Sequence, residues 1–133
     1  MKNRIVVIMV FCSLTMGCAA ISEQGRMEEY GRIMDAYATA MRLSDFNTVC
    51  QYVDPSEVGR KECLQRYDNM KIVGYDLLGV DFARDTRAVT QEVGVEYYFL
   101  DRYVAKTIRV EQSWRYREDR KSWLLQTPPP NFE

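Results

Sequence analysis

The sequence predicts an α+β domain in which one long helix and two short helices pack on a curved four-stranded antiparallel sheet. Three observations predict this class. Apolar residues recur at steps of three and four over residues 27–41. Helix-capping residues then mark two short helices, and from residue 71 onward apolar and polar residues alternate. Because the helical patterns come first and the strand patterns follow, the helices are expected to cover one face of an antiparallel sheet.

Residues 1–17 have the composition of an export signal. Lys2 and Arg4 supply a positive start, an apolar run follows at residues 5–14, and Gly17 is a small residue at the end. A basic region, a short apolar region and a small residue before the cut are typical of a secretory signal. The sequence therefore divides into a signal at 1–17, a short tether at 18–24 and a single domain at 25–133.

A cysteine at the cut site makes this signal resemble those of bacterial lipoproteins. The resemblance implies cleavage after Gly17, lipidation of Cys18 and acylation of the new amino terminus. Thr15 and Met16 depart from the usual leucine and small residue of such signals. Ala19, rather than aspartate, implies sorting to the periplasmic side of the outer membrane in a Gram-negative cell, and a Gram-positive cell would carry the protein outside its plasma membrane. The lipid on Cys18 is then the contact with the membrane.

Two other interpretations of this segment stay open. One is a membrane-spanning anchor, although the apolar run at 5–14 is far shorter than the roughly 20 residues that a spanning helix needs. The other is an ordinary signal peptide in which Cys18 is incidental.

Composition excludes several classes of function. The chain contains no histidine, which excludes histidine acid–base catalysis, Ser–His or Cys–His nucleophiles and histidine-ligated metals. It has 18 basic and 19 acidic residues, and the two basic residues of the signal leave 16 in the mature chain, a balance that does not predict nucleic-acid binding. It carries no glycine-rich phosphate loop and no Cys-x-x-Cys pair. We expect no cofactor and no metal site.

Cys50 and Cys63 remain as a pair after the signal is removed. An even pair of cysteines in an exported protein favours a disulfide. The alternative is two buried free thiols, each acting as a small apolar side chain.

The long helix is expected to begin near Glu23, with Ser22 as its cap. Its apolar stripe is better explained as core than as a ligand pocket. The stripe consists of Met27, Tyr30, Met34, Tyr37 and Met41, widened by Ile33, Ala38 and Ala40. Ser44 or Asp45 caps a second helix that runs through Val53. Asp54 is expected to cap a third helix, with Pro55 in its first turn, that ends near Tyr67.

Four strands follow, at residues 71–82, 88–100, 103–117 and 122–126. Gly74 and Gly79 are expected to mark bulges in the first strand. A two-residue turn at 101–102 would place Phe99 opposite Val104 and would set the register of the central pair. The predicted facing pairs are Tyr97 with Lys106, Val95 with Ile108, Val93 with Val110, Gln91 with Gln112, and Val89 with Trp114. A slip of one residue would destroy this match of apolar with apolar. The next turn, at 119–120, pairs Tyr116 with Trp123 and Trp114 with Leu125.

This architecture is similar to the nuclear-transport-factor-2-like (NTF2-like), or SnoaL-like, cone-shaped family, over residues 22–132. The resemblance rests on the helix stripe from Met27 to Met41 and four short segments. They are Leu43-Ser44-Asp45-Phe46, Asp54-Pro55, Trp114-Arg115-Tyr116 and Ser122-Trp123-Leu124-Leu125. It implies a cavity between sheet and helices. Some members of this family are isomerase-like or cyclase-like enzymes with an ionisable base inside the cone, and others only bind ligands or partners.

The function predicted first is a non-catalytic envelope lipoprotein that binds a small apolar ligand or an envelope protein through the cone. Gln91, Lys106, Gln112 and Tyr97 are the polar candidates for ligand contact. For these residues the alternatives are a hydrogen bond between the two glutamines, and a lysine that reaches past Tyr97 to water.

The alternative is a small isomerase or cyclase. Asp76 or Asp81 would be its base, with a pKa raised by burial, and Tyr30 or Tyr37 would be the hydrogen-bond donor.

Overall fold

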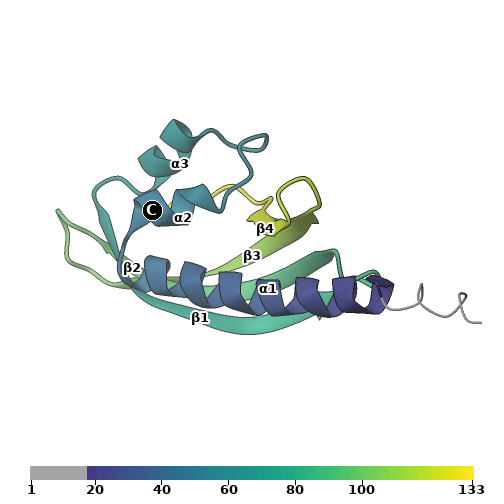
Figure 1. Cartoon of the computed structure of the whole chain (residues 1–133). Coiled ribbons are helices and arrows are strands. Elements are labelled where there is room, and N and C mark those ends of the chain that lie inside the picture. Colours follow the sequence, from purple (N-terminus) through teal and green to yellow (C-terminus); the bar gives the residue numbers. More distant parts are fainter. Residues whose placement is uncertain (1–17) are drawn as a thin grey trace, which may run out of the picture.

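The structure, a computed structural model, describes residues 18–133, with side chains described from Glu23 onward. The elements in chain order are α1 (Cys18–Arg42), α2 (Phe46–Gln51), α3 (Arg60–Arg66), β1 (Met70–Phe82), β2 (Ala88–Phe99), β3 (Lys106–Arg117) and β4 (Ser122–Leu125). The strands form one antiparallel sheet in the order β1-β2-β3-β4. In Figure 1, α1 runs lengthwise along the sheet, and the two short helices α2 and α3 lie above the C-terminal end of α1. The predicted fold class is confirmed.

The register of the central strand pair is the predicted one. The observed pairs include Tyr97 with Lys106, Gln91 with Gln112 and Val89 with Trp114. The following hairpin pairs Tyr116 with Trp123, as expected. The shared inner face explains this agreement, because a slip of one residue would turn every apolar side chain of β2 towards water.

The predicted bulges in β1 are also present. The pairing with β2 shifts between Ile72 and Gly74 and again between Leu77 and Gly79. A side chain at Gly74 would place its Cβ 3.2 Å from the Cβ of Glu96, closer than most such contacts allow. These shifts bend the strand and give the sheet its curvature.

The connection between β2 and β3 is longer than predicted. The two-residue turn at 101–102 and the pairing of Phe99 with Val104 were wrong, because β3 begins only at Lys106. A two-residue hairpin turn requires positive φ, and this segment has no glycine to supply it. Instead the carbonyl of Phe99 accepts from the N–H groups of both Arg102 and Tyr103, and Tyr103 itself takes a φ of 50°.

The inner face of α1 is the predicted stripe. Tyr30, Ile33, Tyr37, Ala40 and Met41 are buried, and the remaining stripe residues are partly buried. The expected start near Glu23 was wrong, because α1 begins at Cys18. Its early turns contain alanines, which favour a helix. The predicted signal at 1–17 and the side chain of Cys18 lie outside the described residues, and no described helix is long and apolar enough to span a membrane.

Arg26 connects α1 to both edges of the sheet. Its guanidinium donates to the carbonyl of Asp85 at 3.3 Å and to Oγ1 of Thr86 at 3.2 Å, in the turn between β1 and β2. Its own carbonyl oxygen accepts from Nε1 of Trp123 in β4, at 2.8 Å. One residue of the helix is therefore tied to both edges of the sheet.

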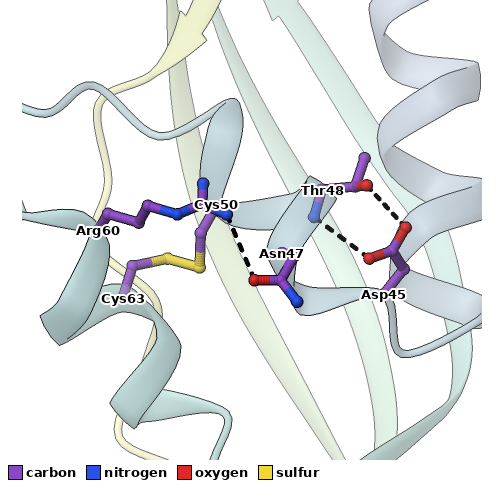
Figure 2. The surroundings of a disulfide bond; sticks show 6 residues. All are labelled: Asp45, Asn47, Thr48, Cys50, Arg60 and Cys63. Carbon is purple, nitrogen blue, oxygen red and sulfur yellow. Dashed lines mark hydrogen bonds between the residues drawn. A yellow bond between two sulfur atoms is a disulfide. The ribbon is translucent and has the colours of Figure 1, made fainter.

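A disulfide joins the two short helices. Cys50 in α2 and Cys63 in α3 are bonded, with their Cα atoms 5.9 Å apart. Figure 2 also shows the hydrogen bond from Arg60 to Asn47, at 3.3 Å, and the cap of α2, in which Asp45 accepts from the N–H and hydroxyl of Thr48. Closing a loop of this size stabilises a fold by about 3 kcal/mol in the chain-entropy model.

Asp54 fastens the helical segment to the sheet instead of starting a helix. The third helix was expected to begin there, but it begins at Arg60, after a turn at residues 55–57 and an extended N-cap at Gly59. The Asp54 carboxylate accepts from Ser56, from Gln126 at 3.1 Å and from Arg117 at 2.8 Å. These contacts direct the chain towards β3 and β4 before the helix starts.

The pKa of Asp54 predicts how stability depends on pH. Burial acts to raise this pKa, but the hydrogen bonds from Ser56, Gln126 and Arg117 outweigh burial and lower it to about 2. The unfolded chain therefore takes up the proton more readily, and the stability present above about pH 4 is lost as the pH falls towards 2. Asp54→Asn should remove about 2 kcal/mol of this pH-dependent stability, as measured by urea unfolding at pH 7 and pH 2.5.

Ser56→Ala is the matched variant for this test, because it removes one donor to the same carboxylate. Its loss between the two pH values should lie between those of the wild type and Asp54→Asn. A pH profile of Asp54→Asn that matches the wild type would contradict the assignment.

Candidate functional site

Four neutral side chains form a hydrogen-bonded chain across the inner face of the sheet. Nε2 of Gln91 donates to Oε1 of Gln112 at 2.8 Å. Tyr30, from α1, donates to Oε1 of Gln91 at 2.7 Å, and Tyr75, from β1, donates to Oε1 of Gln112 at 2.9 Å. All four are buried, so helix and sheet satisfy each other's polar groups without water. The glutamine candidates are therefore occupied by each other and by tyrosines.

Aromatic side chains fill the space beside this chain. Tyr37 packs edge-on against Trp114, with ring centroids 5.1 Å apart, and against Tyr75 at 5.7 Å. The side chains of Tyr67 and Gln112 lie close enough to Tyr37 to affect the pKa of its hydroxyl. Nε1 of Trp114 is buried and has no hydrogen-bond partner among the described residues. The interior is thus a packed core with a polar seam.

The buried tyrosines remain protonated at neutral pH. Burial raises the pKa of Tyr30 to about 12, and it raises those of Tyr37, Tyr67 and Tyr75 further above the ordinary tyrosine range. A phenol in this state donates a hydrogen bond but does not act as a base. The seam can orient an acceptor, and it does not supply a proton acceptor for catalysis.

The structure does not bring the predicted catalytic groups together. Tyr30 and Tyr37 are inside the cone, whereas Asp76 and Asp81 are exposed on β1. The phase of β1, which the bulges made unreadable from sequence, places Tyr75 and not Asp76 on the inner face. No group of three or more His, Cys, Asp or Glu suited to a metal occurs in residues 18–133.

Tyr97 and Lys106 lie together at the opening of the cone. They are direct neighbours on β2 and β3, Tyr97 buried and Lys106 exposed. The hydroxyl of Tyr97 and Nζ of Lys106 donate to one atom, the carbonyl oxygen of Glu133, at 2.8 Å and 2.7 Å. Phe132 packs against Tyr97 with ring centroids 4.9 Å apart. The end of the chain therefore fills the place where these two candidates would meet a ligand.

No pattern in the sequence indicates this role for residues 127–133. They include three consecutive prolines, which cannot continue a strand, and neither Phe132 nor Glu133 belongs to a periodic pattern. The one available signal was the predicted pairing of Tyr97 with Lys106, which places a hydroxyl beside an ammonium.

Two shallow hollows are present, and both are on the outside of the molecule. One is lined by α1 and α2, including Arg32, Asp35 and Leu43. The other lies against α3, near Lys61 and Gln65. Neither includes Gln91, Gln112 or Tyr97, so neither opens into the cone.

Neither a protein-family model nor a curated protein matches this sequence. Solved structures do match it. A ketosteroid isomerase-like protein from Erwinia carotovora shares 14% identity over 74% of this chain and 89% of its own, with a TM-score of 0.54. An LEH-like epoxide hydrolase from Mycobacterium tuberculosis shares 17% over 74% and 77%, with a TM-score of 0.51. A member of the NTF2-like family from Streptomyces avermitilis shares 16% over 78% and 93%, with a TM-score of 0.51.

These likenesses establish an NTF2-like fold for this chain. At this level of identity they concern the fold alone, because one fold hosts many unrelated functions.

The glutamine pair gives a test of the polar seam. Gln112→Met removes the acceptor of two buried donors, Tyr75 and Gln91. Each buried group left unpaired costs about 1–3 kcal/mol, so we expect a loss of at least 2 kcal/mol in the free energy of unfolding, measured in urea. Tyr75→Phe removes one donor and leaves Gln112 its other partners, so it should cost about 1 kcal/mol. An equal or smaller loss for Gln112→Met would show that the seam is not satisfied as described.

Proposed function

We propose that this protein is a lipid-anchored protein of the bacterial cell envelope, and that its domain binds a small apolar ligand or a protein partner without transforming it. The lipid on Cys18 would fix the location. The domain would then need no membrane-binding surface of its own, because two or more acyl chains hold a protein stably on a bilayer.

One observation carries the non-catalytic part of this proposal. Every polar side chain in the seam is neutral and is already paired with another, from Tyr30 through Gln91 and Gln112 to Tyr75. General acid–base chemistry needs a group whose pKa lies near the working pH and which can reach the substrate. The inner face described here offers phenols with raised pKa values and amides, which bind and orient but do not exchange protons.

A small isomerase or cyclase is the alternative. The structural neighbours include an isomerase-like protein and an epoxide hydrolase, which favours this alternative by analogy of fold. It would require Asp76 or Asp81 as the base beside Tyr30 or Tyr37. Because both carboxylates are exposed on β1, a large rearrangement of that strand would be needed, and we favour binding.

Apolar side chains are exposed on β1. Leu77 and Val80, opposite Val93 and Gln91, are 52% and 40% exposed, on a strand that forms one edge of the sheet. Large exposed apolar side chains in a group commonly mark an interaction site. This observation supports the protein-partner form of the proposal.

The anchor is tested by changing Cys18. Cys18→Ser should move the protein from the membrane fraction to the soluble fraction, because the lipid is attached to that thiol. The mature wild-type protein should show, in intact-mass spectrometry, the mass of residues 18–133 plus its acyl groups. Cys12→Ser is the matched control and should change neither result, since Cys12 leaves with the signal. Membrane association that survives Cys18→Ser would favour the spanning anchor.

Binding of a small ligand is tested by extracting purified Cys18→Ser protein with organic solvent. We expect mass spectrometry to recover the same apolar compound, chemically unaltered, in a constant ratio to protein. If several preparations yield no compound, the small-ligand form of the proposal fails and the protein-partner form remains. If the compound is released in altered form, the protein is an enzyme and the proposal is wrong.

A further inference from the structure

Two donors converge on one oxygen at the opening of the cone. Tyr97 and Lys106 come from adjacent strands, and both donate to the carbonyl oxygen of Glu133, at 2.8 Å and 2.7 Å. A hydroxyl and an ammonium directed at the same point form a strong site for an oxygen acceptor, and above all for a charged one.

The Phe132 ring lies next to these donors, among other aromatic rings. The Phe132 ring packs against Tyr97 and Tyr67, with ring centroids 4.9 Å and 5.6 Å apart. Tyr67 also stacks on Phe46 at 4.5 Å, and Phe99 lies 5.8 Å from Tyr97. Phe132 therefore belongs to a cluster of aromatic rings from α2, from the residue after α3 and from β2.

The segment that fills the site is held only by side chains. Oγ1 of Thr127 accepts from the N–H of Ser113, at 2.9 Å. After it, residues 128–133 make no backbone–backbone hydrogen bond with the rest of the described chain. Arg66 donates to the carbonyl of Pro129 at 3.0 Å and to Asn131 at 2.7 Å. Segments without a hydrogen-bonded ladder open at low free-energy cost, so this one can be displaced while the sheet stays folded.

We propose that the opening of the cone is a binding site for a small monocarboxylate with an apolar body, and that residues 128–133 occupy it as a competing internal ligand. The carboxylate replaces the Glu133 carbonyl between Tyr97 and Lys106. The apolar body replaces the Phe132 ring between Tyr67 and Tyr97. This inference rests on the proposed binding function, for which it names the ligand class and the position.

The position differs from the floor of the cone. The floor is filled by the seam of Gln91 and Gln112, whose hydrogen bonds are satisfied inside the protein. At the opening, a ligand can gain Tyr97 and Lys106 as partners by displacing a weakly held segment. The exposed Lys106 also supplies a positive charge beside Tyr97.

Decanoate is the probe, with decanol as its uncharged counterpart, and calorimetry of the full-length Cys18→Ser protein measures the affinity. The apparent affinity of a ligand is its intrinsic affinity multiplied by the fraction of molecules whose site is free of the competitor. Phe132→Ala weakens the internal competitor, so it should bind decanoate at least tenfold more tightly than the Cys18→Ser parent. Adding Lys106→Met should lower that affinity at least tenfold, whereas adding Lys71→Met, at an exposed lysine of β1, should not.

A second measurement does not depend on these variants. The NMR chemical shifts of the amides of Asn131, Phe132 and Glu133 should move towards random-coil values when decanoate is added to the parent protein, because the segment leaves the site. Unchanged shifts with saturating decanoate would overturn the displacement. Equal affinities for decanoate and decanol, or no effect of Lys106→Met, would overturn the carboxylate site.

Two outcomes separate this inference from the proposed function. If solvent extraction recovers a ligand but decanoate does not bind, the inference fails and the binding function stands. If a peptide with the sequence of residues 127–133 binds Phe132→Ala while decanoate does not, the site recognises an extended chain, and the small-carboxylate inference is wrong.

Discussion

The hydrogen bond between Gln91 and Gln112 lies at the centre of the inner sheet face, and the rest of the structure is arranged around it. Two buried amides on adjacent strands need each other, because either one alone would leave polar atoms without partners away from water. Their pairing sets the register of β2 against β3. Through Tyr30 and Tyr75 it also joins α1 and the edge strand β1 to the same point.

This arrangement limits what the interior can do. A seam whose donors and acceptors are all used internally stabilises one packing of helix on sheet, and it leaves no group in the ionisation state that proton transfer needs. The opening of the cone is different, because there a buried tyrosine and an exposed lysine meet a segment that has no ladder to hold it. The side chains that could meet a ligand are therefore Tyr97 and Lys106 at the opening, and not the glutamine seam in the interior.

Features that depend on local spacing could be predicted from the sequence, and features that depend on distant contacts could not. The register, the inner faces of β2 and of α1, and the cap at Asp45 were predictable, because each depends on local spacing and on the burial of one face. The hairpin loop was not, since Tyr103 takes a positive φ that nothing in its side chain favours. The start of α3 was not either, because contacts with Arg117 and Gln126, distant in sequence, recruit Asp54 to the sheet.

The candidate site shows this limit most clearly. The sequence by itself determined that Gln91 faces Gln112 and Tyr97 faces Lys106, because alternation has only two phases and one of them would bury charge. It also determined the absence of histidine, which is a matter of composition. Only the tertiary structure decided that Asp76 and Asp81 lie outside, because two bulges shift the phase of β1. Only the tertiary structure placed Phe132 and Glu133 in the opening, since a segment without periodicity takes its position from the surfaces that it meets.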